Sequence, residues 1–150
     1  MKEMLNEIEN TEHTSEKWFQ WYKEFRPRTA LEPHNVELVD INEDQIVLRM
    51  EIGDHAKQPY GLLHGGISMM LAESAASIHA CWDVDLSKTA PVGIEVNGSH
   101  LRPATDGHVL TTARVIRKSK TLIHHHIELI HEESGKMLSM ARITNLYKTL

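Results

Sequence analysis

The chain has 150 residues, which is the size of one average domain. Apolar residues make up 41% of it and charged residues 25%, a composition typical of a globular protein rather than a disordered one. Because 16 Lys and Arg stand against 21 Asp and Glu, the formal net charge is −5, which disfavours a nucleic-acid partner. The single cysteine, Cys81, excludes an internal disulfide and a zinc site built from several cysteines.

No targeting segment is expected. The first nine residues are acidic and lack the basic start and apolar run of a signal peptide. The longest apolar stretch, 67–82, is interrupted by Glu73 and His79 and is too short to span a bilayer. We therefore expect no membrane partner and a cytoplasmic protein in which Cys81 is a reduced thiol.

Residues 15–25 predict a short helix. Ser15 is the expected N-cap, and Pro27 ends the helix. Four aromatic residues recur at helical spacing: Trp18, Trp21, Tyr22 and Phe25. They form either a core-facing stripe, which we favour, or the roof of a pocket. Since no repeat is visible, residues 1–150 are expected to form one domain, with 1–35 as an N-terminal helical extension.

The rest of the chain alternates between apolar and polar residues in short runs. Residues 36–41 and 46–52 flank the turn-forming segment 42–44, which indicates a β-hairpin. One long helix is expected at 65–82. Four more extended segments follow it: 90–101, 108–117, 121–132 and 136–147. Strands joined by tight turns form an antiparallel sheet, so the predicted class is α+β.

The long helix has almost no polar face. Most of its positions are apolar or small: Ile67, Met69, Met70, Leu71, Ala72, Ala75, Ala76, Ile78 and Ala80. We therefore expect it to be buried nearly all round, with the sheet wrapped about it. Glu73 is its one carboxylate, and a buried Glu is rare unless it is paired or functional. Either Arg102, Arg114 or Arg142 neutralises it from the sheet, or it is a functional acid, which we favour.

The residues that begin this helix explain that preference. Segment 62–66 reads LLHGG, and the first-turn amides of Gly65 and Gly66 have no partner within the helix. Together with the helix dipole, such amides bind an anion, or a carbonyl oxygen that becomes negatively charged during a reaction. The chain has no GxxxxGK[ST] phosphate loop, and no GxSxG elbow surrounds Ser74. A phosphate loop and a serine-hydrolase site are therefore excluded.

These features together resemble a known family. Its matching segments are 58–66 (QPYGLLHGG), 71–74 (LAES) and 92–100 (VGIEVNGSH). The chain resembles the hotdog-fold acyl-CoA thioesterases over roughly residues 36–147. The resemblance is strongest to the branch that acts on 4-hydroxybenzoyl-CoA, 1,4-dihydroxy-2-naphthoyl-CoA and phenylacetate-pathway thioesters. It implies an antiparallel sheet of five to six strands around one long central helix.

The resemblance also implies roles for single residues. Gly65 would offer its backbone N–H to the thioester oxygen, supported by Gln58 and His64. Glu73 would be either the nucleophile or the general base that activates water, and both options stay open. The candidates for substrate contacts are Gly66, Met70, Ser77, Asn97 and His100. Ser77 lies on the Glu73 face at i+4 and could hold either the attacking water or the acyl ring. No metal or redox cofactor is implied, because coenzyme A enters only as part of the substrate.

Helix geometry adds an independent constraint. Gly65 and Glu73 are eight residues apart, which is about 12 Å along a helix at 1.5 Å per residue. Oxyanion donor and base must each lie about 3 Å from the reacting group. One helix cannot easily supply both, whereas two antiparallel copies can. We therefore expect an active site shared between two subunits, and the family resemblance implies a homotetramer.

Two charged or titratable clusters remain. Arg114, Arg117, Lys118 and Lys120 lie close together at a predicted strand turn. They are either a solvated surface run or the contacts for coenzyme A phosphates, and in the second case Arg117, Lys118 and Lys120 bind substrate.

The histidine run 124–126 invites a metal interpretation. In a strand only His124 and His126 share a face, with Glu128 next along it, and two imidazoles and a carboxylate could bind a metal. Positions 123, 127 and 129 are apolar and mark the other face as the buried one. We expect these histidines to meet solvent or a subunit interface, and we assign no metal site.

The predicted activity is hydrolysis of acyl-CoA thioesters with aromatic or small acyl groups. Two alternatives stay open: a hotdog hydratase or dehydratase, and a non-catalytic acyl-CoA sensor. The sequence leaves undecided whether coenzyme A or a carrier protein holds the acyl group. Release of free thiol from several thioesters would separate the three readings.

Overall fold

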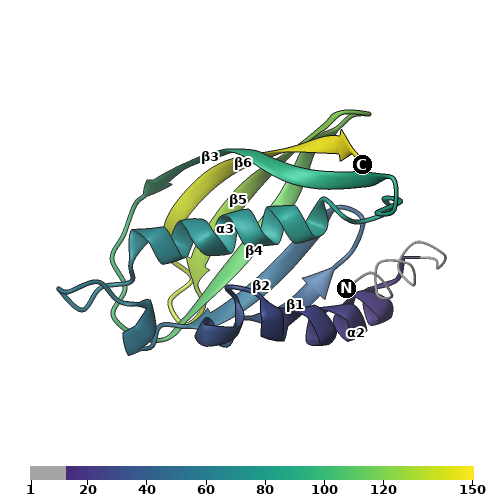
Figure 1. Cartoon of the computed structure of the whole chain (residues 1–150). Helices are drawn as coiled ribbons and strands as arrows, with labels where there is room; N and C mark the ends of the chain where they lie inside the picture. The colour runs from purple at the N-terminus through teal and green to yellow at the C-terminus, as the bar shows by residue number, and fades with distance from the viewer. Residues whose placement is uncertain (1–12) are drawn as a thin grey trace.

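A computed structural model describes residues 13–150. Six antiparallel strands form one sheet in the order β1-β2-β4-β5-β6-β3, curved around the long helix α3 (Figure 1). The strands are β1 (Glu37–Ile41), β2 (Gln45–Glu51), β3 (Thr89–His100), β4 (His108–Lys118), β5 (Leu122–His131) and β6 (Met137–Thr149). The helices are α2 (Ser15–Phe25) and α3 (Gly65–His79), with short 3-10 turns at Arg26–Arg28, Glu32–His34 and Asp54–Ala56. The predicted α+β class and strand positions are confirmed.

Turn chemistry fixes the hairpins where the sequence predicts them. The Asn42 side chain accepts hydrogen bonds from the amides of Asp44 and Gln45, which closes the β1–β2 turn. Gly135 has φ +66 in the β5–β6 turn, a conformation that favours glycine. Among residues 13–150, the long strand β3 pairs only with β6 and so forms one edge of the sheet.

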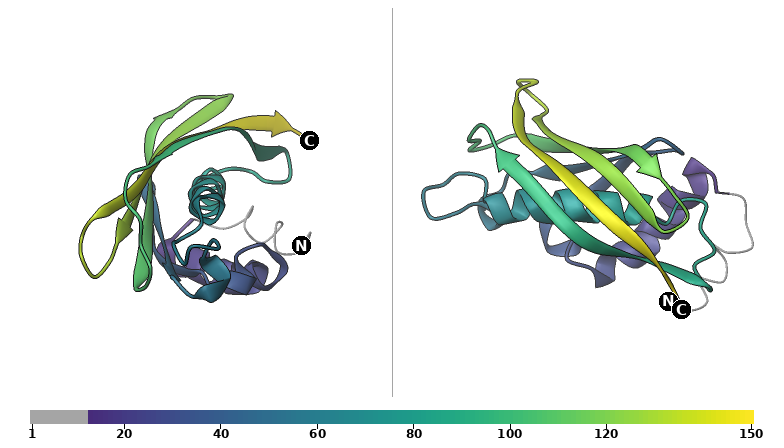
Figure 2. Two further views of the ribbon diagram at one scale, coloured as in Figure 1. Left: turned by 90° about the vertical axis from the view of Figure 1, so that its left-hand side faces the viewer. Right: turned by 90° about the horizontal axis from the view of Figure 1, so that it is seen from above.

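The helix α3 lies in the concave side of the sheet but is not enclosed by it. Seen end-on, the sheet curves around part of its circumference (Figure 2). One face is buried against the sheet: Ser68, Leu71, Ala72, Ala75, Ala76 and His79. The opposite face contains exposed Glu73 and half-buried Met70 and Ser77. The expectation of a helix buried all round with an interior Glu73 is therefore wrong for a single chain, because the sheet covers only one side.

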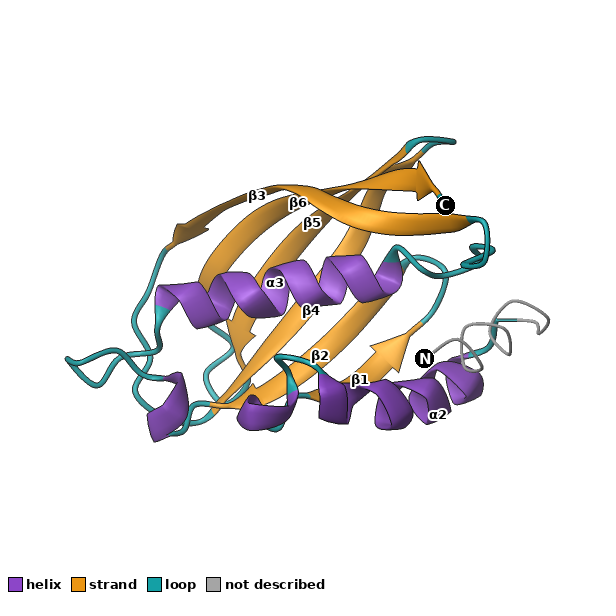
Figure 3. Ribbon diagram, viewed as in Figure 1, coloured by secondary structure: helices purple, strands orange, loops and turns teal. Residues whose placement is uncertain are grey.

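The helix α2 packs beside β1 and closes the lower edge of the core (Figure 3). Thr14, not the expected Ser15, is its N-cap and accepts from the Lys17 amide, whereas the Ser15 hydroxyl donates to the Ile41 carbonyl at 2.6 Å. Three of its aromatic side chains are buried: Trp18, Trp21 and Tyr22. The core-facing stripe is therefore confirmed. Residues 1–12 of the expected N-terminal extension lie outside the described residues.

The carboxyl-terminal end of α3 is fixed by two buried histidines. His79 Nε2 donates to the Asn42 carbonyl at 2.8 Å, so its Nδ1 accepts, at 2.9 Å, from His125 Nε2. His124 and His126 lie on the outer face as expected, but His125 is fully buried, because alternation turns it inward. Only His124 and His126 were expected on the outer face, and the burial of His125 agrees with its place on the same face as the apolar positions 123, 127 and 129. Burial lowers the pKa of His79 and, with the neighbouring His79, lowers that of His125 to about 3.

No helix among residues 13–150 is long and apolar enough to cross a membrane.

The histidine pair predicts stability that is lost in acid. Both side chains are neutral in the folded protein, while their unfolded pKa is about 6.5. Stability is therefore fully present above pH 6.5 and falls as the pH drops towards the folded pKa values. The free energy of unfolding should fall by up to about 1.4 kcal/mol per pH unit for each histidine.

Urea unfolding at pH 5, 6 and 7 measures this slope at one protein concentration. The double variant His79→Leu/His125→Leu should lose much of the pH dependence, while the matched pair His124→Leu/His126→Leu on the outer face should keep it. An unchanged slope in the first variant would contradict the assignment.

Candidate active site

The loop before α3 presents the first turn of the helix. Gly61, at φ +78, turns the chain, and the Gln58 amide donates to the Leu62 carbonyl at 2.8 Å. The amides of Leu63 and His64 then donate to the carbonyls of Ala104 and Ala56 at 2.8 and 2.9 Å. This places His64 as the N-cap of α3 and fixes the direction in which the helix amides point.

The Gly65 amide is a free donor at this terminus. His64 Nδ1 accepts from the Gly66 amide at 2.8 Å, which removes Gly66 as a free donor. No acceptor among residues 13–150 bonds to the Gly65 N–H. The His100 ring lies against Gly65, where an added Cβ would stand 2.6 Å from its Nε2. A side chain at position 65 would therefore displace His100.

A cavity of about 460 Å³ lies at this end of the helix. The expected residues Gln58, His64, Gly65 and His100 all line it, so the structure brings together this half of the predicted site. Ser139 on β6 holds the His100 ring through Nδ1 at 2.9 Å.

Arg102 also lines the cavity. It uses Nη1 to donate to the Met137 carbonyl at 3.0 Å, which leaves other guanidinium donors for a ligand. From the sequence, Arg102 was expected only as a partner for Glu73.

Glu73 lies on the open face of α3, two turns further along. Its Oε1 approaches Gly93 of β3, where an added Cβ would stand 2.9 Å away. Ser77, one turn beyond, donates to Asn145 Oδ1 at 3.1 Å. Glu73, Ser77 and two sheet residues therefore form a second cluster, which contains none of the residues around the Gly65 amide.

No arginine neutralises Glu73. Arg102 bonds the Met137 carbonyl, Arg114 bonds Glu128 at 3.0 Å, and Arg142 bonds Glu95 at 2.5 Å. Within residues 13–150, Glu73 has no ion pair. The alternative of a structural arginine partner is therefore wrong, and the exposed carboxylate is free to react.

An apolar cavity of about 330 Å³ lies beside the Glu73 cluster. Ser74, Ser77 and Ile78 of α3 line one side of it. The other side is formed mainly by α2 and the segment after it: Trp18, Phe25, Thr29, Ala30 and Leu31. Aromatic residues of α2 therefore contribute to the core and also roof a pocket. Cys81 lines it too, but burial raises the pKa of its thiol to about 12, so the thiol is a poor nucleophile.

The remaining predicted contacts are dispersed. Met70 is half-buried on α3, and Asn97 is exposed on β3. Arg117, Lys118 and Lys120 are exposed around the β4–β5 turn, where Lys118 Nζ donates to the Trp82 carbonyl at 3.0 Å. This basic turn therefore lies at the carboxyl-terminal end of α3, opposite the Gly65 end.

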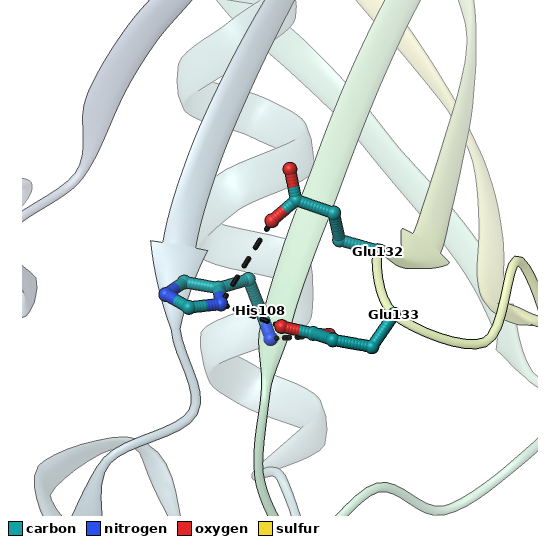
Figure 4. Close-up of side chains that lie close together, drawn as sticks. All are labelled: His108, Glu132 and Glu133. Carbon is teal, nitrogen blue, oxygen red and sulfur yellow. Dashed lines mark hydrogen bonds and ion pairs between the residues drawn. The ribbon is translucent and has the colours of Figure 1, made fainter.

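A third cluster, formed by His108, Glu132 and Glu133, resembles a cation site only in composition (Figure 4). His108 Nδ1 lies 2.7 Å from Glu133, whose other oxygen accepts from the His108 amide at 3.0 Å. These contacts lower the pKa of Glu133 to about 2. Arg49 pairs with Glu132 at 2.8 Å. The carboxylates are thus already partnered, and the cluster links the β5–β6 turn to β2 and β4.

Comparison with known proteins identifies the family. Residues 60–138 match the thioesterase superfamily. The chain is 35% identical over 109 residues to 1,4-dihydroxy-2-naphthoyl-CoA hydrolase from Listeria monocytogenes. The aligned region covers 73% of this chain and 87% of that one. The chain belongs to the thioesterase superfamily.

Solved thioesterase structures share its fold. A mutant of thioesterase PA1618 from Pseudomonas aeruginosa superimposes with a TM-score of 0.84 at 28% identity, over 95% of this chain and 99% of that one. Thioesterase HI1161 from Haemophilus influenzae gives 0.81 at 27% identity, over 95% and 96%. The predicted hotdog thioesterase fold is confirmed, and this chain is an enzyme of thioester hydrolysis.

Three functional candidates escaped the sequence analysis. Arg102 and Ser139 enter the Gly65 cavity from the sheet, and Asn145 holds Ser77. One signal was present for Asn145, since it is a polar residue between Ile143 and Tyr147 on the inward-facing side of β6. No sequence signal pairs it with Ser77, because 68 residues separate them.

The thioesterase activity should depend on the absence of a side chain at position 93. In Gly93→Ala, the new Cβ would stand 2.9 Å from Glu73 Oε1 and displace the carboxylate. We expect kcat to fall at least about tenfold, because misplacing a reacting group by about 1 Å is costly. Gly98→Ala is the matched control: it adds the same methyl to the same strand but meets Met69. Equal kcat in Gly93→Ala and wild type would contradict this placement of Glu73.

Proposed function

We propose that this thioesterase hydrolyses acyl-CoA thioesters with aromatic or small acyl groups, in active sites that two chains build together. The Gly65 amide polarises the thioester carbonyl, with Gln58 and His64 supporting the oxyanion. Glu73 of the partner chain attacks the carbonyl carbon or removes a proton from the attacking water. The thiolate of coenzyme A then leaves. The relative from Listeria monocytogenes is named as a hydrolase of a CoA thioester, which supports this substrate class.

The observation that carries the proposal is the separation of the two clusters on α3. Gly65 and Glu73 differ by eight residues on one unbroken helix, about 12 Å along its axis, and no residue lines both cavities. Oxyanion donors act at about 3 Å from the reacting oxygen. A second α3, antiparallel to the first, brings its Glu73 to the Gly65 end of its neighbour.

The edge strand β3 offers the surface for that second copy. It is 12 residues long, and its outer edge pairs with no strand among residues 13–150. Val92, Ile94 and Val96 are 44%, 56% and 41% exposed along it. A long edge with exposed apolar side chains favours pairing with another strand. A two-fold pairing of β3 strands is isologous and sets the two α3 helices antiparallel.

The phosphates of coenzyme A would meet basic side chains from both chains. Antiparallel helices bring the carboxyl-terminal end of one α3, with its basic turn (Arg117, Lys118 and Lys120), towards the Gly65 end of the other. Arg102 already lies at that end. The acyl group would enter the apolar cavity beside Ser77, whose volume is at the lower end of the range for small-molecule pockets. An aromatic ring or a short chain suits such a pocket.

Subunit mixing tests the shared site. Glu73→Ala should lower kcat by several orders of magnitude. Gly65→Pro removes the amide N–H at the first helical position, where proline is tolerated, and should cost at least about a hundredfold. Gly65→Ala keeps the N–H and serves as the control for the added Cβ. Hybrids of Glu73→Ala and Gly65→Pro, refolded together at equal amounts, should recover about a quarter of wild-type activity, since half the dimers hold one intact site. Failure to recover would show that one chain forms the site alone.

Filling the apolar cavity tests the acyl specificity. Ala30→Trp places a large side chain in the cavity from an exposed position. We expect kcat/KM for benzoyl-CoA to fall at least about tenfold while acetyl-CoA hydrolysis changes little, measured by release of free thiol. Arg28→Trp, on the neighbouring turn outside the cavity lining, should leave both rates unchanged. Equal losses for both substrates, or none, would contradict this acyl site. Binding of thioesters without thiol release would favour the sensor, and hydration without thiol release the hydratase.

A further inference from the structure

The buried side chain of Asn145 has two polar atoms, and only one of them makes a hydrogen bond with the described residues. It is fully buried on β6, and its Oδ1 accepts from the Ser77 hydroxyl at 3.1 Å. Its Nδ2 is buried without a partner among residues 13–150. A buried donor without an acceptor costs about 1–3 kcal/mol. Such a group is retained where it serves a site rather than the fold.

The neighbours of Asn145 belong to the Glu73 cluster. Asn145 and Gly93 are directly opposite each other in the β3–β6 ladder. A Cβ added to Gly93 would lie 2.9 Å from Glu73 Oε1 and 3.6 Å from Asn145 Oδ1. Glu73, Ser77 and Asn145 therefore meet above the bare backbone of Gly93.

The bond to Asn145 decides what Ser77 can do. A serine hydroxyl has one proton and two lone pairs. Because that proton is donated to Asn145 Oδ1, Ser77 Oγ can only accept a further hydrogen bond. A water molecule beside Glu73 could then donate one proton to the Glu73 carboxylate and the other to Ser77. Both lone pairs of the water oxygen stay free, and one of them would face the substrate carbonyl.

We propose that Asn145 is a positioning residue that fixes the Ser77 hydroxyl as an acceptor for the attacking water. This inference rests on the proposed role of Glu73. As the water oxygen bonds to the carbonyl carbon, its proton passes to Glu73. The C–S bond then breaks, and the leaving thiolate takes that proton. Ser77 and Asn145 return unchanged, and the same water would attack a Glu73 anhydride if Glu73 reacts first.

Double-mutant kinetics test the positioning role. Asn145→Leu should lower kcat about tenfold to a hundredfold with KM changed by less than about twofold, and Ser77→Ala should do the same. The double variant Ser77→Ala/Asn145→Leu should be no slower than the slower single variant, because both changes remove one interaction. Losses that multiply in the double variant would overturn the inference.

The matched control is Thr111→Val. Thr111 is also fully buried, and its hydroxyl has no partner within the described part of the chain, but it lies on β4 and lines neither cavity. Its replacement should leave kcat unchanged. A loss equal to that of Asn145→Leu would show that removing any buried polar group slows the enzyme, and would overturn the inference.

The pH dependence of kcat distinguishes a positioning role of Asn145 from a purely structural one. Asn145→Asp keeps an acceptor for Ser77 but places a second carboxylate beside Glu73. The acid limb of the kcat profile should move to higher pH, because the added charge opposes ionisation of Glu73. If Asn145→Asp does not fold, Asn145→Ser, which is smaller and neutral, should show the loss in kcat without the displaced limb. An unmoved limb in folded Asn145→Asp, or wild-type kcat in Asn145→Ser, would overturn the inference.

Glu73→Ala, measured in the same assay, separates this inference from the proposed function. Full activity of Glu73→Ala would contradict both the proposed function and the role inferred for Asn145. An inactive Glu73→Ala together with a fully active Asn145→Leu would overturn only the role of Asn145.

Discussion

The proposed shared site follows from the fixed distance between the Gly65 amide and the Glu73 carboxylate on one helix. The sheet holds α3 by its buried face, and the His79–His125 pair fixes its carboxyl-terminal end to β5 and the β1–β2 turn. Gly65 and Glu73 therefore cannot approach each other within a chain. The same one-sided packing leaves Glu73 exposed, so the geometry that separates the Gly65 amide from Glu73 also leaves this carboxylate open to a second chain.

Much of the fold could be predicted from local chemistry. Alternation between 46 and 52, the Asn42 turn and Gly135 specify hairpins without help from distant residues. The first turn of α3 was equally accessible, because glycines at a helix start expose amides whatever surrounds them. The burial of α3 was misjudged, since an apolar composition does not say which side meets the sheet and which remains for a partner chain.

The candidate site was only half accessible to sequence analysis. Gln58, His64 and Gly65 lie within one segment of eight residues, and a local motif identifies them. Asn145, Arg102 and the aromatic residues of α2 reach the site through sheet register and tertiary packing, which a single sequence does not encode in any local pattern. The burial of His125 follows from strand alternation, because it lies on the same face as 123, 127 and 129, but its hydrogen bond to His79 does not, because 46 residues separate the two.

The most direct test of the shared site is a crystal structure with an acyl-CoA analogue in which a ketone replaces the thioester. A shared site would place the ketone oxygen about 3 Å from the Gly65 amide of one chain, with the carboxylate of the partner's Glu73 facing the ketone carbon. The acyl group would lie against the α2 segment that lines the apolar cavity. A ketone held by Gly65 and Glu73 of the same chain, or one that contacts neither residue, would contradict it.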